Sequence, residues 1–326
     1  MKLIVSPSPH LHSKNNTVSL MWDVVIALLP AAAVAVWFYG WSVLLTMILC
    51  ILTCQAVEIL CTKFLLKRKL QLNPSAFVTG LLLALNLPPA APWYIAVIGS
   101  VVAIGIGKMT FGGLGQNIFN PALLGRVFLL ISFPVAMTDW SLTQTAMEFS
   151  AFGIGPKVDA FTGATDLALA KLGTPHPFTW DMALIRVGGC IGELSAAALF
   201  IGFIYLLARK VVKITIPAAI IITVAVISGI FNAVDPQTYT GPLFNIFTGG
   251  LLLGAFFMAT DYVTCPMSAK GQIIFGVGIG VIIMMIRYFG SYPEGTSFAI
   301  LIMNCAVPLI DRYTQSKRFA KEVHNG

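Results

Sequence analysis

The sequence predicts an all-α polytopic membrane protein, with about ten transmembrane helices in two inverted five-helix repeats. Composition indicates the fold class, because 57% of the 326 residues are hydrophobic and only 10% are charged, whereas soluble domains carry about 25% charged residues. A mean hydropathy of +0.87 over this length excludes a soluble enzyme, a disordered chain and a nucleic-acid-binding protein. The chain also contains many apolar runs that approach the length of about 20 residues required for a membrane-crossing helix.

Ten apolar segments follow one another along the chain, and each predicts one membrane helix. They lie at residues 22–39, 42–61, 75–88, 92–108, 118–135, 185–208, 214–232, 244–260, 271–289 and 296–311. The third and the eighth are short, and both start in stretches rich in glycine, proline and asparagine. Short, interrupted segments at matching positions of two halves are typical of membrane proteins that bind a ligand between the halves.

An internal repeat relates the first five segments to the last five. FVTGLLLAL at residues 77–85 resembles FTGGLLLGA at 247–255, and NPALLGR at 120–126 resembles NCAVPLIDR at 304–312 more weakly. Each copy holds five segments, which is an odd number, so we expect the second copy to cross the membrane in the inverted sense. Chance similarity between Gly/Leu-rich helices is the alternative explanation.

A polar stretch separates the repeats and divides the chain into three parts. These are a membrane repeat at 1–135, a loop at 136–184, and a second membrane repeat with a short cytoplasmic tail at 185–326. Fifteen of the 20 Lys and Arg residues fall on one side of the predicted helices, together with both termini. Because basic residues collect on the cytoplasmic side of membrane proteins, we expect the loop to be extracytoplasmic. The net charge of +7 then reflects helix orientation, and no nucleic-acid partner is expected.

The loop contains DAFTGAT at residues 159–165, which resembles the flavinylation motif Asp-x-x-(Ser/Thr)-Gly-Ala-(Ser/Thr). The last hydroxyl residue of that motif is esterified to the phosphate of FMN, and here it is Thr165. The small residues before it leave the backbone accessible to an attaching enzyme, and the acidic residue offers that enzyme a charged handle. These other motif residues are Asp159, Thr162, Gly163 and Ala164. An ordinary polar loop without modification is the alternative.

Longer blocks resemble the D subunit of the Rnf electron-transport complex and, less closely, the B subunit of the sodium-pumping NADH:quinone reductase. The blocks are SPSPHLHSKNNTVSLMWDVVIALLPA, FGGLGQNIFNPALLGRVFLLISFP, the DAFTGAT loop and NCAVPLIDRYTQ. Together the similarity extends over nearly the full length. The quinone-reductase protein usually carries a longer cytoplasmic segment before its first helix, so the roughly 20 residues present here favour the Rnf protein.

The resemblance implies one carrier in an ion-pumping complex that moves electrons between reduced ferredoxin and NAD and translocates Na⁺ or H⁺. It implies covalent FMN on Thr165 and a second, non-covalent flavin such as riboflavin among the helices. The implied partners are two small membrane subunits, a ferredoxin-like iron–sulfur subunit, an NADH-binding subunit, a second subunit with covalent FMN, a flavin-attaching transferase and membrane lipid. The implied location is the cytoplasmic (inner) membrane of a bacterium or archaeon, with both termini in the cytoplasm.

Several ionisable residues lie in or beside the apolar segments, where a charge at the bilayer centre costs about 2.5–3.5 kcal/mol on insertion scales. Asp261 is the strongest candidate for an ion pathway, because Thr260 and Thr264 can add the oxygen ligands that hard cations prefer. Arg126 is expected to meet a flavin or a carboxylate, and Glu193 belongs to the same group without a more specific role. Pairing or an interfacial position is favoured for Asp23, Glu58 and Arg287.

Metal centres and nucleotide sites have little support in the sequence. The six cysteines include no CxxC pair and are interpreted as small buried hydrophobes, although a role as cluster ligands or redox groups stays open. None of the four histidines lies inside an apolar run, so no metal site is predicted. The chain also lacks a nucleotide-binding glycine loop. We therefore expect it to act only together with partner subunits.

Two other functions fit the same sequence. A solute channel or transporter would account equally well for an inverted repeat, with DAFTGAT as an ordinary loop. The B subunit of the quinone reductase would differ in its electron acceptor. The sequence does not specify the coupling ion, the direction of electron flow or the flavin potential.

Overall fold

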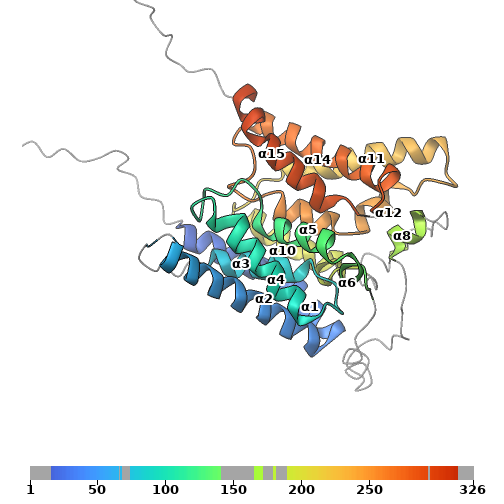
Figure 1. Ribbon diagram of the computed structural model, residues 1–326. Helices are drawn as coiled ribbons and strands as arrows, with labels where there is room; N and C mark the ends of the chain where they lie inside the picture. The colour runs from blue at the N-terminus through green and yellow to red at the C-terminus, as the bar shows by residue number, and fades with distance from the viewer. Residues whose placement is uncertain are drawn as a thin grey trace, which may run out of the picture.

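The computed structural model describes residues 16–65, 67, 74–140, 165–171, 179–180, 189–292 and 294–314. A helix lies within each of the ten predicted segments, and these residues contain no β-strand. The protein is therefore all-α over the part of the chain that is described. Most helices of the N-terminal half, blue to green, lie together in Figure 1, and the orange and red helices of the C-terminal half lie beside them, whereas the helix Ala196–Ala208 of the C-terminal half packs on the first helix of the chain.

The N-terminal half consists of the helices that precede the loop. They are α1 (Thr17–Tyr39), α2 (Trp41–Leu60) with the π-helical turn η1 (Cys61–Leu65), α3 (Ser75–Leu85), α4 (Trp93–Ile104) with the π-helical turn η2 (Gly105–Met109), α5 (Pro121–Ser132) and α6 (Pro134–Met137). The start of α5 shows how the sequence sets a boundary. The Asn120 side chain accepts the N–H of Ala122 at 3.1 Å, and Pro121 occupies the first helical position, where a missing N–H costs nothing.

The C-terminal half follows one short helix of the loop, α8 (Asp166–Lys171). Its elements are η3 (Ile191–Glu193), α10 (Ala196–Ala208), α11 (Thr215–Val234), α12 (Pro242–Phe247), α13 (Leu251–Leu253) with the π-helical turn η4 (Gly254–Met258), α14 (Ala269–Phe289) and α15 (Thr296–Thr314). The eighth predicted segment is thus broken. Thr248 has extended backbone angles and Gly249 has a φ of 72°, a left-handed conformation that glycine adopts without steric cost.

The lengths of the helices support a polytopic membrane protein. Within the described residues, four helices are long and apolar enough to cross a bilayer: Thr17–Tyr39, Trp41–Phe64, Thr215–Val234 and Ala269–Phe289. Four shorter apolar helices accompany them in this part of the chain: Ser75–Leu85, Trp93–Met109, Pro121–Ser132 and Ala196–Ala208. Helix length alone therefore identifies fewer complete crossings there than the ten predicted segments.

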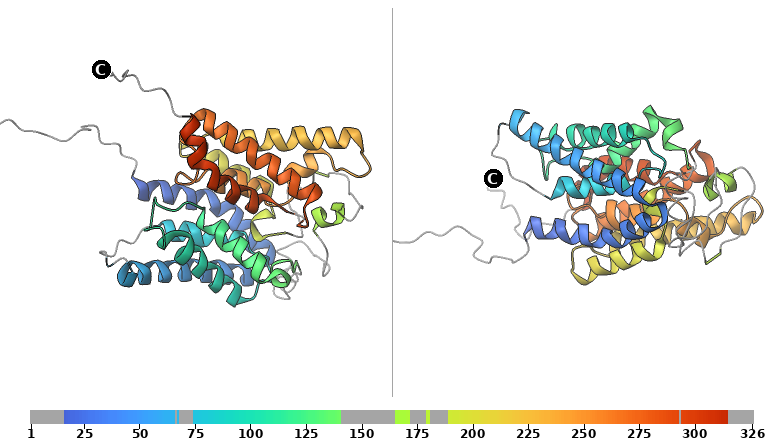
Figure 2. Two further views of the ribbon diagram at one scale, coloured as in Figure 1. Left: turned by 45° about the horizontal axis from the view of Figure 1, so that its top comes forward. Right: turned by 90° about the horizontal axis from the view of Figure 1, so that it is seen from below.

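Helix packing follows the same order in both halves. In the N-terminal half α2 packs on α3 and α4, and α4 packs on α5. In the C-terminal half α11 packs on α12 and α14, and α14 packs on α15. The halves meet along α1 and α10, which lie side by side in both views of Figure 2. This recurrence supports the predicted relation between the two copies.

In Figures 1 and 2 the start of α1 and the end of α15 lie together at one end of the helix bundle, and α8 lies at the other. We call these the terminal end and the α8 end of the molecule.

Candidate functional site

The attachment motif is described only at its last residue. Asp159, Thr162, Gly163 and Ala164 lie outside the described residues. Thr165 immediately precedes α8, and its hydroxyl accepts the N–H of Ala168 at 3.3 Å. Its carbonyl accepts the N–H of Leu169 at 2.9 Å, so Thr165 acts as the N-cap of the helix. The side chain is only 8% exposed.

Both ends of α8 are attached to the C-terminal half. The Lys171 ammonium donates to the carbonyls of Gly290 and Tyr292, the latter at 2.8 Å, just beyond the end of α14. A lysine near a helix C-terminus satisfies carbonyls that lack intrahelical partners and complements the negative end of the helix dipole. At the other end, a methyl group placed on Gly249 would lie 2.7 Å from Leu167. The helix that follows Thr165 is therefore fixed to the break between α12 and α13.

A cavity opens between α8 and the C-terminal half. Basic and aromatic side chains line it, including Lys171, Arg287, Tyr239 and Tyr288. The two tyrosine rings meet edge to face with their centroids 4.9 Å apart. The Arg287 guanidinium donates to the carbonyls of Asn245 and Thr248, the latter at 2.9 Å. It therefore stabilises the backbone of the helix break by hydrogen-bonding its carbonyls. The cavity combines positive charge with aromatic surface.

Arg126 is buried between the halves on the same side of the molecule. It is 7% exposed and donates through Nη1 to Asn86 Oδ1 at 2.7 Å. Through Nη2 it donates to Cys190 Sγ at 3.1 Å and to Glu294 Oε2 at 3.0 Å. A second carboxylate, Glu193, lies 4.0 Å from the same nitrogen. The sequence allowed a flavin or a carboxylate as the partner of Arg126, and the structure supplies carboxylates.

Glu294 lies in the connection between α14 and α15, where its two oxygens have different partners. One oxygen accepts from Arg126, and the other accepts the Gly250 N–H and the Thr296 hydroxyl, the latter at 3.3 Å. Burial alone would raise the pKa of this carboxyl, but the charges of Arg126 and Arg287 and the Gly250 N–H lower it overall. Glu294 is therefore held as a carboxylate.

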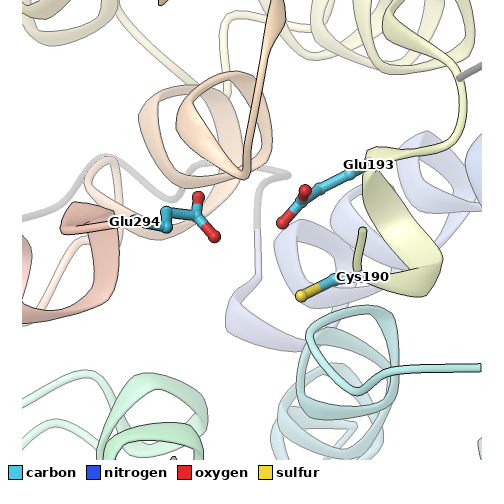
Figure 3. A group of neighbouring side chains, drawn as sticks. All are labelled: Cys190, Glu193 and Glu294. Carbon is cyan, nitrogen blue, oxygen red and sulfur yellow. The ribbon is translucent and has the colours of Figure 1, made fainter. Parts of the chain in front are cut away.

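The group around Arg126 also has the composition of a metal site. The ligand atoms of Cys190, Glu193 and Glu294 all lie within 4.8 Å of one another. Figure 3 shows the two carboxylates pointing toward each other, with the Cys190 sulfur beside them. Arg126 Nη2 bonds two members of this group. A guanidinium thus provides the positive charge that the carboxylates require in a buried position.

A second cavity lies between the halves toward the terminal end. Its walls are mostly apolar, and its polar side chains include Asp261, Thr260, Asn117, Asn120 and Lys108. The Thr260 hydroxyl donates to a carbonyl of the preceding turn at 2.8 Å. The Asp261 carboxylate accepts from Thr264 at 3.3 Å. The predicted ion-pathway residues are therefore close together, with Asp261 and Thr260 facing a shared cavity.

Burial raises the pKa of the Asp261 carboxyl, although the Val263 N–H and the Thr264 hydroxyl act in the opposite direction. Thr264 is linked to the N-terminal half through Asn304, a residue of its own half. With the Asn304 amide oriented to match its neighbours, Asn304 donates to Thr264 O at 3.1 Å and accepts the Asn120 N–H at 3.2 Å. Asn120 and Asn304 are the first residues of the two matched sequence blocks, so the weaker repeat signal marks a direct contact between the halves.

Sequence reasoning missed Lys108 as a lining residue of this cavity. Lys108 lies in the π-helical turn η2, and its ammonium bonds Glu58 Oε1 and Ser75 Oγ, both at 2.7 Å. The second oxygen of Glu58 has no hydrogen-bond partner within the described part of the chain. A π-helical turn rotates the following side chains relative to α-helical periodicity, and such turns are frequent at functional sites. A lysine at the end of an apolar run gives no sequence signal of burial.

The residues expected to pair do so. Asp23 accepts from Arg209 at 3.3 Å and from the Tyr205 hydroxyl at 2.9 Å, Glu58 pairs with Lys108, and Arg287 binds backbone carbonyls. The cysteines are mixed: three are buried, Cys61 and Cys265 are half-buried, and Cys305 is exposed. The prediction that all six are small buried residues therefore holds for Cys50, Cys54 and Cys190.

Comparison with known proteins agrees with this architecture. The chain is 46% identical to the D subunit of the Na⁺-translocating ferredoxin:NAD⁺ oxidoreductase complex of Acetobacterium woodii, over 97% of this chain and 95% of the relative. It is 42% identical to the D subunit of the proton-translocating ferredoxin:NAD⁺ oxidoreductase complex of Clostridium ljungdahlii, over 97% and 95% of the two chains. It is 40% identical to the D subunit of the ion-translocating oxidoreductase complex of Stutzerimonas stutzeri, over 93% and 92% of the two chains.

The family model described as the NQR2, RnfD, RnfE family matches residues 4–320. This match includes both membrane halves, the loop between them and every residue of the two cavities. The helical architecture and the relatives lead to the same assignment. The chain therefore belongs to the NQR2, RnfD, RnfE family of membrane proteins.

Proposed function

We propose that the protein is the membrane subunit of an ion-pumping complex in which electron transfer between ferredoxin and NAD drives translocation of Na⁺ or H⁺. The similarity to the D subunits of two ferredoxin:NAD⁺ oxidoreductase complexes supports this proposal. In it, Thr165 carries FMN through a phosphoester bond. The protein is one component of a redox-driven translocase and is not a complete enzyme alone.

The observation that supports the flavin most directly is the position of Thr165 beside a suitable cavity. The hydroxyl lies at the start of α8, and Leu167, Ala170 and Lys171 of α8 line the cavity together with Arg287 and the aromatic pair. Positive side chains suit a phosphate, and aromatic rings suit the flat flavin ring. The residues present therefore fit FMN, which would supply one- and two-electron redox chemistry at this position.

The chain's own residues would hold and orient that group. Lys171 and Leu167 fix α8 to the C-terminal half. Arg287 stabilises the break between α12 and α13 by donating hydrogen bonds to its carbonyls. Because Thr165 is 8% exposed, we expect the attaching transferase to reach it before α8 packs against the bundle. The later packing then excludes water from the attachment bond.

The second cavity is the proposed location of the non-covalent flavin. It lies between the halves, and its apolar walls can cover a ring system while polar groups from Asn117, Asn120 and Ser75 can bind ribityl hydroxyls. Asp261 and Thr260 line the same cavity. The proposed ion pathway therefore runs next to the proposed second redox group, which is the arrangement required for electrostatic coupling.

The proposed partners are the two small membrane subunits, the iron–sulfur subunit, the NADH-binding subunit and the second subunit with covalent FMN. We propose that all of them work in the cytoplasmic (inner) membrane of a bacterium or archaeon. The terminal end, which holds the start of α1 and the end of α15, would face the cytoplasm. The α8 end would face the opposite side, where the flavin-attaching transferase acts.

The test is the covalent flavin itself. The full chain, expressed with a flavin-attaching transferase, should weigh more than its sequence by one esterified FMN and should remain fluorescent after denaturation. Thr165→Ala removes the acceptor hydroxyl and should abolish both signals. The matched control Thr162→Ala keeps that hydroxyl and should retain most of the modification. An unmodified mass for the unchanged chain would reject the flavin and leave a solute transporter as the better interpretation.

A further inference from the structure

Three parts of the α8 end meet at one glycine. A methyl group placed on Gly249 would lie 2.7 Å from Leu167 Cδ1, 3.0 Å from Arg287 Nη2 and 3.1 Å from Glu294 Oε1. Leu167 is two residues after Thr165, so the segment that would carry the flavin packs on the same backbone as an arginine and a carboxylate. A methyl group at this position would require the Leu167 side chain to shift.

Gly250, the next residue, lies beside the buried cluster of charged side chains formed by Arg126, Glu193 and Glu294. A methyl group on Gly250 would lie 2.7 Å from Glu294 Oε1, 3.1 Å from Glu193 Oε1 and 3.5 Å from Arg126 Nη1. The Gly250 N–H itself donates to Glu294. Two carboxylates and a guanidinium therefore lie directly beside the helix break.

The three charged side chains of the cluster produce a strong electrostatic field. Arg126 lies 3.0 Å from Glu294 and 4.0 Å from Glu193, so the guanidinium interacts with both carboxylates. All three side chains are at most 15% exposed. Charges in such surroundings interact through a low effective dielectric and are little screened by salt. A charge that is added near α8 will therefore interact with these three side chains even from several ångströms away.

We propose that Arg126, Glu193 and Glu294 are positioning residues that set the midpoint potential of the flavin on Thr165 through their electrostatic field. This inference rests on the proposed function. Adding an electron at the flavin adds negative charge, so the positive charge of Arg126 favours reduction and the two carboxylates oppose it. In the proposed function electrons move between ferredoxin and NAD through the partner subunits, so the proposal requires no further reductant.

The sign of the potential shift tests this idea. In the full chain carrying its flavin, Arg126→Gln removes a positive charge and should lower the midpoint potential measured by redox titration of the flavin absorbance. Glu294→Gln removes a negative charge and should raise it. The double variant should return close to the unchanged chain, and Arg126→Lys should shift the potential less than Arg126→Gln. A purely structural role of the pair predicts no such opposite signs.

The matched control is Arg209→Gln. Arg209 also pairs with a carboxylate of the other half, Asp23, at 3.3 Å, but it lies at the terminal end and is half exposed. Its removal should leave the flavin potential unchanged. Equal potentials, or shifts of the same sign in Arg126→Gln and Glu294→Gln, would overturn the proposal.

Two further outcomes are distinguishable. If Arg126→Gln does not fold, the near-isosteric Glu294→Gln decides the question alone, because an unchanged or lowered potential contradicts the proposed field. If the unchanged chain shows no fluorescence after denaturation, the proposed function fails first, and the inference fails with it. A fluorescent chain whose potential ignores the cluster rejects only the inference.

Discussion

The α8 end and the terminal end of the interface each bury a basic side chain, but they connect it differently. At the α8 end, Arg126 of the N-terminal half bonds Glu294 of the C-terminal half. At the terminal end, Lys108 bonds Glu58, and both belong to the N-terminal half. The first ion pair therefore joins the halves, whereas the second stabilises the wall of one cavity.

The two ion pairs are about equally buried, so they differ mainly in which parts of the molecule they connect. The side chains of Arg126 and Glu294 are 9% and 15% exposed, and those of Lys108 and Glu58 are 3% and 12% exposed. Loss of Arg126 removes an ion pair between the halves, whereas loss of Lys108 removes an ion pair within the N-terminal half. The comparison therefore predicts that the buried pair at the α8 end helps to hold the halves together and that the buried pair at the terminal end does not.

The largest expected effect is therefore that of Arg126→Gln on stability. Removing one partner of a buried ion pair costs about 3–5 kcal/mol, because the remaining charge stays buried. We expect the detergent-solubilised variant to unfold at a clearly lower temperature than the unchanged chain. Arg126→Lys keeps the charge and should lose less. Unfolding at the temperature of the unchanged chain would show that the pair does not hold the halves together.

Lys108→Met should have a smaller effect. It leaves the Glu58 carboxylate buried without its cation, which also costs about 3–5 kcal/mol, but it breaks no contact between the halves, so we expect a loss at the lower end of that range. Combining it with Glu58→Gln should restore part of the stability, since the charge is then removed as well. The comparison between the two ends breaks down if Lys108→Met destabilises more than Arg126→Gln under the same conditions.

Arg209→Gln should have the smallest effect among the ion pairs. Arg209 also joins the halves, because it bonds Asp23 of α1 from the end of α10, but its side chain is 52% exposed. Exposed ion pairs contribute about 0–1 kcal/mol. We therefore expect a melting temperature close to that of the unchanged chain. A loss as large as that of Arg126→Gln would mean that joining the halves matters more than burial.

Local features of this architecture could be predicted from the sequence, whereas contacts between the halves could not. Apolar runs located the helices, and Asp261 and Thr264 meet because they lie three residues apart in one turn. Arg126 was recognisable as a buried charge within an apolar run. Its partner Glu294 is 168 residues away, in a polar connection where a glutamate is an ordinary residue. Only the packing of the halves brings the two together.

Backbone irregularities limited the prediction in a second way. Lys108 follows an apolar run and would continue its helical periodicity, but the π-helical turn at Gly105–Met109 changes which way the side chain points. The break at Gly249 likewise depends on packing against α8 and Glu294. The sequence marked that segment as interrupted through its glycines. It provided no indication of which side chains would surround the break.

Asp261→Asn should leave stability almost unchanged and still impair function. It therefore distinguishes the terminal end, where we expect a functional effect, from the α8 end, where we expect an effect on stability. The carboxyl is half-buried and bonds Thr264 rather than a basic side chain, so an amide of the same shape leaves no charge without a partner. Burial already raises its pKa, and the amide mimics the neutral form. A cation route nevertheless needs the charged form, so coupled ion transport should fall in the reconstituted complex while flavin content and melting temperature stay constant. Asp311→Asn is the matched control, because that carboxylate accepts the Met267 N–H and lines neither cavity. Normal coupled transport in Asp261→Asn would exclude the carboxylate from the pathway and leave the terminal end with a structural role only.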